Sequence, residues 1–345
     1  MAHALPLGRT GDAAGDARYA AIVTLLGLSL LASMGLSLTL GSFPTPPGRV
    51  LHALTDPKDS DIAFIVWDLR LPRILLATLV GAALAVAGAI LQGIVRNPLA
   101  SPDVIGITGG AALAAVAFLA LFGGVLSAHW LPVAALLGAL CAAALVLSLA
   151  WRRGITPSRL VLVGIGLSAA MGAMTTLLIV LSDDAAAMVA YVWLTGSLYA
   201  AQWQDVAGLV PWLLVAIPPC LARSRHLDAM ALGDQVARGL GVNILHSRLV
   251  LMACSVALAG AAVAYAGGLS FVGLIAPHVA ARLVGHGFAR LAPVSALVGA
   301  LIVLHADLLG RVAFLPADLP AGIFVSGVGA PFFVYLLHRT RHRRH

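Results

Sequence analysis

The sequence is built from apolar runs of about 20 residues, separated by short polar segments. An α-helix needs about 20 apolar residues to cross a hydrocarbon core of about 30 Å. Measured this way, the chain contains ten candidate spans. They cover residues 19–40, 74–95, 104–123, 131–151, 160–181, 206–221, 249–266, 269–283, 292–309 and 323–337.

Composition agrees with a lipid environment. Hydrophobic residues make up 61% of the chain and charged residues only 10%, with a mean hydropathy of +0.99. Soluble domains carry about 25% charged residues. We therefore predict an all-α polytopic membrane protein of ten transmembrane helices.

Two apolar runs need separate treatment. The run at 19–40 follows Arg9 and Arg18, as in a signal peptide, but its 22 residues are too long for a typical signal core. The stretch 249–281 would make about 50 Å of helix, too long for one span. We expect a turn at Gly267 and Gly268, followed by a short helix that Pro277 breaks.

The positive charges predict the orientation. With the N-terminus inside, 16 of the 21 Lys and Arg residues lie in inside segments, so both termini are expected in the cytoplasm. The predicted domains are a cytoplasmic N-terminal segment at 1–18, a ten-helix transmembrane domain at 19–338 and a basic cytoplasmic tail at 339–345.

The net charge of +7 does not indicate nucleic-acid binding, because the excess lies in short loops on the predicted inside. Cys141, Cys220 and Cys254 lie far apart in apolar runs, without the spacing of a metal site. The tail HRTRHRRH could bind a metal or heme through its histidines, but it is also typical of an arginine-rich tail that stops translocation. We favour the tail and predict no metal site.

The longest inside loop, 222–247, contains Leu232, Val236 and Leu240 at four-residue intervals. This is one apolar stripe of a short helix over 230–240, which Gly239 and Gly241 would end. The helix is too short to cross a bilayer. It is either a membrane-surface helix or an element that docks into another protein, and the spacing alone leaves both open.

Two proline-containing segments lie at inside ends of spans. RNPLASPDVIG, at 96–106, holds Pro98 and Pro102, and IAPHVAARLVG, at 275–285, holds Pro277 and His278. Interrupted helices in corresponding halves of a membrane protein indicate an internal repeat and a transport path. The path or gate candidates are Asn97, Pro98, Ser101, Pro102, Pro277 and His278. His278 alone is more typical of an interfacial histidine than of a ligand.

Few charges lie within spans. Asp307 and Arg311 are one helical turn apart near an outer end, as expected of a mutually paired couple. The first eight spans hold no carboxylate in their middle, which argues against an ion-coupled carrier. The chain also lacks Walker A, H-E-x-x-H and G-x-S-x-G motifs, so we predict no catalytic residue and no cofactor of its own.

Four sequence blocks resemble permeases of the ferric-siderophore, heme and cobalamin class of ABC importers. They are RLPRILLATLVGAALAVAGAILQGIVRNPLASPDVIGI at 70–107, MALGDQVARGLGV at 230–242, GGLSFVGLIAPHVAARLVGH at 267–286 and LPADLPAGIFVSGVGAPFFVYLL at 315–337. The stretch WLTGSLYAAQWQDV at 193–206 is most similar to ferric-citrate permeases. The resemblance covers about 19–339 and departs from the family pattern mainly at 315–322.

The resemblance implies a permease subunit of the bacterial inner membrane, paired with a second permease that is either a copy or a paralogue. It also implies two ATPase subunits, which carry ATP and Mg²⁺, and a periplasmic substrate-binding protein. The expected cargo is ferric siderophore or ferric citrate, with heme or cobalamin as alternatives. An ion-coupled carrier and a non-transporting anchor are the competing functions.

The resemblance also assigns residues. A coupling helix at about 229–241 would transmit ATPase closure to the membrane, and the periplasmic arginines Arg70 and Arg311 would pair with glutamates of the binding protein. This docking role for Arg311 competes with its pairing to Asp307. The ATPase-coupling candidates are Met230, Leu232, Gly233, Asp234, Leu240 and Gly241.

Overall fold

The computed structural model describes residues 10–59, 61–123, 125–151 and 156–341, and over these residues the chain forms helices and no strands. The α-helices are α1 (Thr10–Thr39), α2 (Pro47–Thr55), α3 (Leu71–Val95), α4 (Ile107–Phe122), α5 (Leu131–Ala150), α6 (Pro157–Leu181), α7 (Asp184–Leu194), α8 (Trp203–Ala222), α9 (Ser224–Ala231), α10 (Asp234–Gly239), α11 (Ile244–Ala266), α12 (Val272–Val284), α13 (Phe288–Val312) and α14 (Ala321–Arg341). Shorter turns include a π-helix at Ile65–Arg70 and a 3₁₀ turn at Pro102–Ile105.

The prediction of an all-α membrane protein is confirmed, since seven helices in the described chain are long and apolar enough to cross a bilayer. Each of the ten predicted runs coincides with a helix, but α4, α12 and the apolar part of α14 are shorter than a full span. The count of ten therefore stays a prediction. Helix α7 is an apolar helix that the run lengths did not predict.

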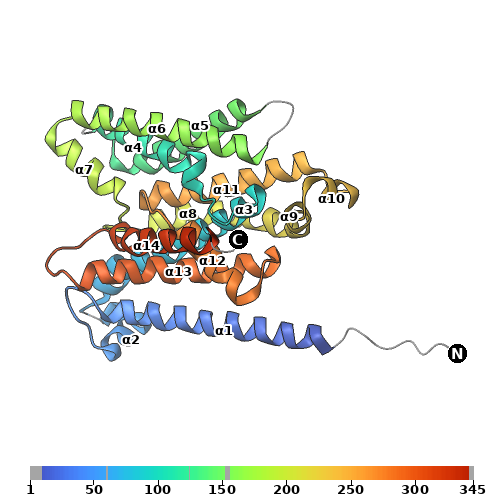
Figure 1. Cartoon of the computed structure of the whole chain (residues 1–345). Helices are drawn as coiled ribbons and strands as arrows, with labels where there is room; N and C mark the ends of the chain where they lie inside the picture. The colour runs from blue at the N-terminus through green and yellow to red at the C-terminus, as the bar shows by residue number, and fades with distance from the viewer. Residues whose placement is uncertain (1–9, 60, 124, 152–155, 342–345) are drawn as a thin grey trace.

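The long helices lie side by side along one direction (Figure 1). Helices α9 and α10 lie at one end of this bundle, together with the first turns of α1, whereas α2 and α7 lie at the other. The inner helices are mostly buried. In the segment Ile65–Val95, which contains α3, 78% of the most apolar stretch is buried inside the protein, whereas in Ala14–Thr39 of α1 the share is 17%. The outer helices therefore present apolar side chains to lipid, as the exposed leucines of α1 show.

The backbone of helix α3 packs directly against the backbones of α12 and α13. A Cβ atom placed on Gly88 would lie 1.8 Å from the carbonyl oxygen of Gly273, and one on Gly81 would lie 2.2 Å from that of Gly299. Small residues allow such close approach between membrane helices, where dispersion contacts stabilise packing. These glycines fix the spacing of the three helices that form the centre of the protein.

The structure corrects the predicted break at Pro277. Helix α12 runs through this proline, and the chain instead turns before it, at 267–271, where Gly267 and Phe271 have φ of +70° and +67°. Proline lacks the N–H that would bond the carbonyl of Gly273. The side-chain amide of Gln92 lies 3.3 Å from this carbonyl and donates to it, which replaces the missing partner.

Two further boundaries differ from expectation. The single helix predicted over 230–240 is wrong, because Gly233 has φ +118° and separates α9 from α10. Helix α1 begins at Thr10, inside the segment 1–18 that was predicted to precede the first span. At the other terminus α14 extends to Arg341, and residues 342–345 of the predicted tail lie outside the described residues.

The backbone contact at Gly88 yields a stability prediction. Gly88→Ala should destabilise the protein by about 1–3 kcal/mol, because the new methyl group overlaps the Gly273 carbonyl. The matched control is Gly27→Ala in α1, where nothing lies within 4 Å of the added Cβ. There, alanine should be neutral or stabilising by up to about 1 kcal/mol. Thermal unfolding in detergent measures both, and equal effects would contradict the packing account.

Candidate functional site

A cavity of about 710 Å³ lies at the end of the bundle that holds α9 and α10. Its walls come from the last turns of α3 and the residues after them, from α9, and from α12 with the first turn of α13. Four of the predicted path residues line it, namely Asn97, Pro98, Pro277 and His278. The structure therefore brings together the two proline-containing segments, which are far apart in sequence.

The remaining two path candidates, Ser101 and Pro102, are not among the residues that line the cavity. Ser101 is buried, and Pro102 packs against α12, with its Cδ 3.0 Å from a Cβ placed on Gly273. Helix α3 ends before them because Arg96 adopts a left-handed conformation with φ +56°. Asn97 then caps the turn by accepting a bond from the Leu99 amide at 3.0 Å. The path role of Ser101 and Pro102 stays a prediction.

The polar lining of the cavity is mainly basic. Among the described lining residues, Arg96, Arg282, His278 and His286 are the basic side chains, and Asp228 is the one carboxylate. Gln92 adds an amide that bonds the carbonyls of Gly273 and Leu274 at 3.3 and 3.4 Å. Arg96 is paired with Asp234, so Arg282 is the lining arginine without an ion pair among the described residues, and it favours an anionic group beside it.

His278 also contacts α14. Its ring meets that of Phe332 edge to face, with centroids 5.7 Å apart. Such a contact orients the imidazole within the wall. This arrangement agrees with the interpretation of His278 as an interfacial histidine, although the site role of His278 stays a prediction.

Helix α9 forms one wall of the cavity and is bound to its neighbours. Leu227, Asp228 and Ala231 line the cavity. The Asp228 carboxylate accepts the Phe288 amide at 2.9 Å, which ties α9 to the start of α13. A Cβ on Gly93 would lie 2.9 Å from the Leu227 side chain, so α9 also packs directly on α3.

The coupling candidates divide into a buried and an exposed group. Met230 is buried in the core, while Leu232, Val236 and Leu240 are 70%, 48% and 65% exposed. An exposed apolar group of this kind at the polar end of a membrane protein is typical of a protein contact. Gly233 and Gly241 adopt positive φ, which places α10 as a separate projecting turn.

Asp234 connects α10 to the end of α3 and to the first turns of α11. Its carboxylate pairs with Arg96, after α3, and with Arg248, in α11, both at 3.1 Å. Neither arginine was predicted as a site residue, because the pairs join residues from three separate segments. Movement of α10 would therefore act on α3 and α11 directly.

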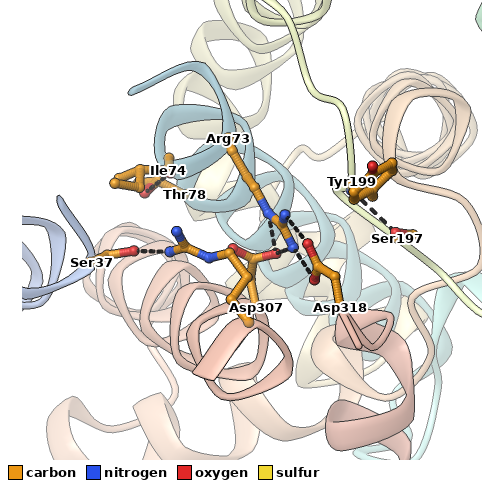
Figure 2. Close-up of polar contacts among 9 residues, drawn as sticks. Ser37, Arg73, Ile74, Thr78, Ser197, Tyr199, Asp307 and Asp318 are labelled. Carbon is orange, nitrogen blue, oxygen red and sulfur yellow. Dashed lines mark hydrogen bonds and ion pairs between the residues drawn. The ribbon is translucent and has the colours of Figure 1, made fainter. Parts of the chain in front are cut away.

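The opposite end of the bundle holds a buried charge cluster (Figure 2). Arg73 of α3 bonds the Asp307 carboxylate of α13 at 2.8 Å and the Asp318 carboxylate through both terminal nitrogens, at 2.6 and 2.9 Å. Asp307 is fully buried and also forms an ion pair with Arg311 at 3.2 Å. Arg311 donates in turn to Ser37 of α1.

The predicted pairing of Asp307 with Arg311 is thus present, but Arg73 is the central residue of the cluster, and sequence reasoning missed it. Arg70 is also buried, at 5% exposed, and donates to Thr45 at 3.1 Å and to the backbone carbonyls of Leu38 and Phe43. Arg311 is 7% exposed. Both proposed docking arginines are therefore occupied with internal contacts in this structure.

Comparison with known proteins identifies the fold and its relatives. Residues 29–339 match the FecCD transport family. The chain belongs to the FecCD transport family. Among family relatives, the achromobactin transport system permease protein CbrC of Dickeya dadantii is 51% identical over 320 residues, 93% of this chain and 92% of its own.

Further relatives agree on the class of protein. The Fe(3+) dicitrate transport system permease protein FecD of Escherichia coli is 42% identical, covering 93% of this chain and 99% of its own. A solved inward-facing metal-chelate type ABC transporter superposes with a TM-score of 0.80 at 31% identity, covering 93% of this chain and 99% of that one. This FecCD protein is accordingly an ABC-transporter permease subunit, a multi-pass protein of the inner membrane.

The charge cluster yields a second prediction. Arg73→Gln should destabilise the FecCD protein by about 3–5 kcal/mol, because it leaves Asp307 charged and buried without its main partner. The control is Arg49→Gln, which removes the ion pair of Arg49 with Asp61, two residues with largely exposed side chains. That change should cost about 0–1 kcal/mol. Comparable losses in unfolding temperature for both variants would contradict a central role for Arg73.

Proposed function

We propose that this permease moves a ferric chelate from periplasm to cytoplasm by alternating access driven by a separate ATPase. The observation that carries the proposal is that the segment 224–240 lines the cavity and is also exposed at the end of the bundle. Helix α9 is a wall of the cavity, and the turn after it presents exposed leucines at the end of the bundle. A protein bound to these leucines can therefore reshape the cavity directly.

The mechanism requires that the ATPase bind two states of the permease with different affinity. Three contacts would transmit its movement inward: the pairs of Asp234 with Arg96 and Arg248, the bond of Asp228 to Phe288, and the packing of Leu227 on Gly93. Met230, Gly233 and Gly241 would hold the segment in shape, and Leu232 and Leu240 would touch the partner.

The proposed topology has ten spans with both termini in the cytoplasm. Ten apolar helices support the count, with α4, α12 and α14 as short spans and α7 as an outer helix. The first turns of α1 lie at the same end as α9 and α10, where the ATPase would bind (Figure 1). ATP and Mg²⁺ would reside on that partner.

The proposed assembly contains a second permease, either a copy or a paralogue, two ATPases and a periplasmic binding protein. Family membership and the superposition on an ABC transporter support it. Docking by Arg70 and Arg311 remains part of this proposal. Because both arginines contact α1 or the residues after it, a direct contact with the binding protein needs that segment to move.

The proposed cargo is ferric siderophore or ferric citrate. Relatives named for achromobactin and for ferric dicitrate support this class, as does the basic lining of the cavity. Arg282, which forms no ion pair among the described residues, would attract an anionic chelate, whereas Arg96 is already paired with Asp234. Selection among chelates would then lie mainly with the binding protein.

Assembly with the ATPase is directly testable. The double variant Leu232→Asp/Leu240→Asp should lose ATPase copurification at least about tenfold, because two charged groups would be buried against the partner. The control Leu232→Met/Leu240→Met keeps the apolar surface and should copurify normally. Retention of the ATPase by the Asp variant would contradict docking at these leucines.

Transport by the reconstituted assembly tests the cargo. Proteoliposomes containing the permeases, ATPase and binding protein should accumulate radiolabelled ferric citrate or ferric siderophore only with ATP and Mg²⁺. Uptake without nucleotide would overturn the ATPase-driven mechanism. Uptake of heme or cobalamin in preference to every ferric chelate supplied would overturn the cargo assignment.

A further inference from the structure

A second pocket, of about 330 Å³, lies where the first turns of α1 meet the end of α12 and the start of α13. Three arginines from these three helices converge on it: Arg18, Arg282 and Arg290. Among the described residues that line it there is no carboxylate. From this arrangement we infer that the pocket binds the phosphate-bearing headgroup of an anionic membrane lipid.

The charge of the pocket is only partly neutralised from within the protein. Arg290 pairs with Asp16 at 2.5 Å, and its guanidinium lies 5.7 Å from the centre of the Tyr19 ring. Within the described part of the chain, Arg18 and Arg282 have no ion-pair partner. The local balance is therefore three arginines against one aspartate, which leaves two positive charges for a ligand.

The depth of the pocket matches the lipid headgroups. Arg290 and Arg311 stand near opposite ends of α13, and the 21 residues from one to the other make about 31 Å of helix. That length equals the hydrocarbon thickness of a bilayer, about 30 Å. Arg290 thus lies at the membrane surface on the side of α9 and α10, which the proposed function takes as the cytoplasmic side.

The rest of the pocket fits a lipid better than a free phosphate ion. Ile22, Leu283 and Val284 form an apolar part beside the arginines. Leu25, one turn further along α1, is 68% exposed on the lipid-facing helix and continues this apolar surface toward the bilayer centre. Basic pockets between helices on the cytoplasmic side are where anionic lipids bind. An inorganic ion would gain nothing from the apolar part.

The pocket is also connected to the transport cavity. Ala281 and Arg282 line both spaces, so the end of α12 forms the partition between them. Tyr19 and Ile22 of α1 and Leu283 and Val284 of α12 pack against the same hydrophobic cluster beside this partition. A bound lipid would hold α1 and α12 together at one wall of the cavity.

Native mass spectrometry of the full chain in detergent, with phosphatidylglycerol or phosphatidylcholine added, tests the proposal. The wild-type protein should retain phosphatidylglycerol about tenfold or more above phosphatidylcholine. The variant Arg18→Gln/Arg282→Gln/Arg290→Gln should lose this preference. The control Arg159→Gln/Arg225→Gln/Arg238→Gln removes the same charge at the same end, outside the pocket, and should keep it.

Four outcomes would overturn the proposal. They are equal retention by the wild type and the pocket variant, equal loss in both triple variants, release of the lipid by excess inorganic phosphate, and release by the purified ATPase, which would assign the pocket to a protein contact. If the pocket variant does not fold, Arg18→Gln/Arg282→Gln breaks no ion pair between described residues and serves in its place. Because this measurement needs no nucleotide or transport, its failure leaves the proposed function intact.

Discussion

The close approach of α3 to α12 and α13 is the constraint on which the other features depend. Glycines at both contacts bring backbone against backbone, so the relative positions of the three helices cannot vary smoothly. Arg73 and Gln92 stand at opposite ends of α3, one facing α13 and the other facing α12. The same packing therefore positions the charge cluster at one end and the cavity at the other.

The two ends differ in how tightly they are closed. At the end with the charge cluster, Arg73, Asp307 and Arg311 join α1, α3 and α13 through buried charges, which tolerate little separation because each needs its partner. At the end that holds α9 and α10, residues of α3, α12 and α13 instead line the cavity. A bundle closed at one end and hollow at the other would suit the inward-facing state named for the similar transporter if, as proposed, α9 and α10 lie on the cytoplasmic side.

Sequence alone predicted the features that depend on neighbouring residues. The length of the apolar runs predicted the long helices, and the prolines indicated the two segments that line the cavity. The four-residue spacing of Asp307 and Arg311 predicted their ion pair. It missed what depends on distant residues. Nothing local to Arg73 indicates Asp318, 245 positions away, and nothing local to Arg70, which the resemblance assigned to docking, indicates that its side chain is buried. The break at Gly233 was missed because an apolar stripe continues across it.

Under the proposed function, the unpredicted interactions would let one segment, 224–240, contact both the partner ATPase and the cavity. If residues 230–240 formed one continuous helix, the buried Met230 and the exposed Leu240 would move together as a rigid body. The turn at Gly233 separates them, and Asp234, directly after it, is fixed to α3 and α11 by two arginines. A force on the exposed leucines therefore reaches the membrane helices through charged contacts at Asp234 and through the packing of α9. Under the proposed function, coupling would therefore need the residues that connect segments as well as the exposed leucines of the stripe.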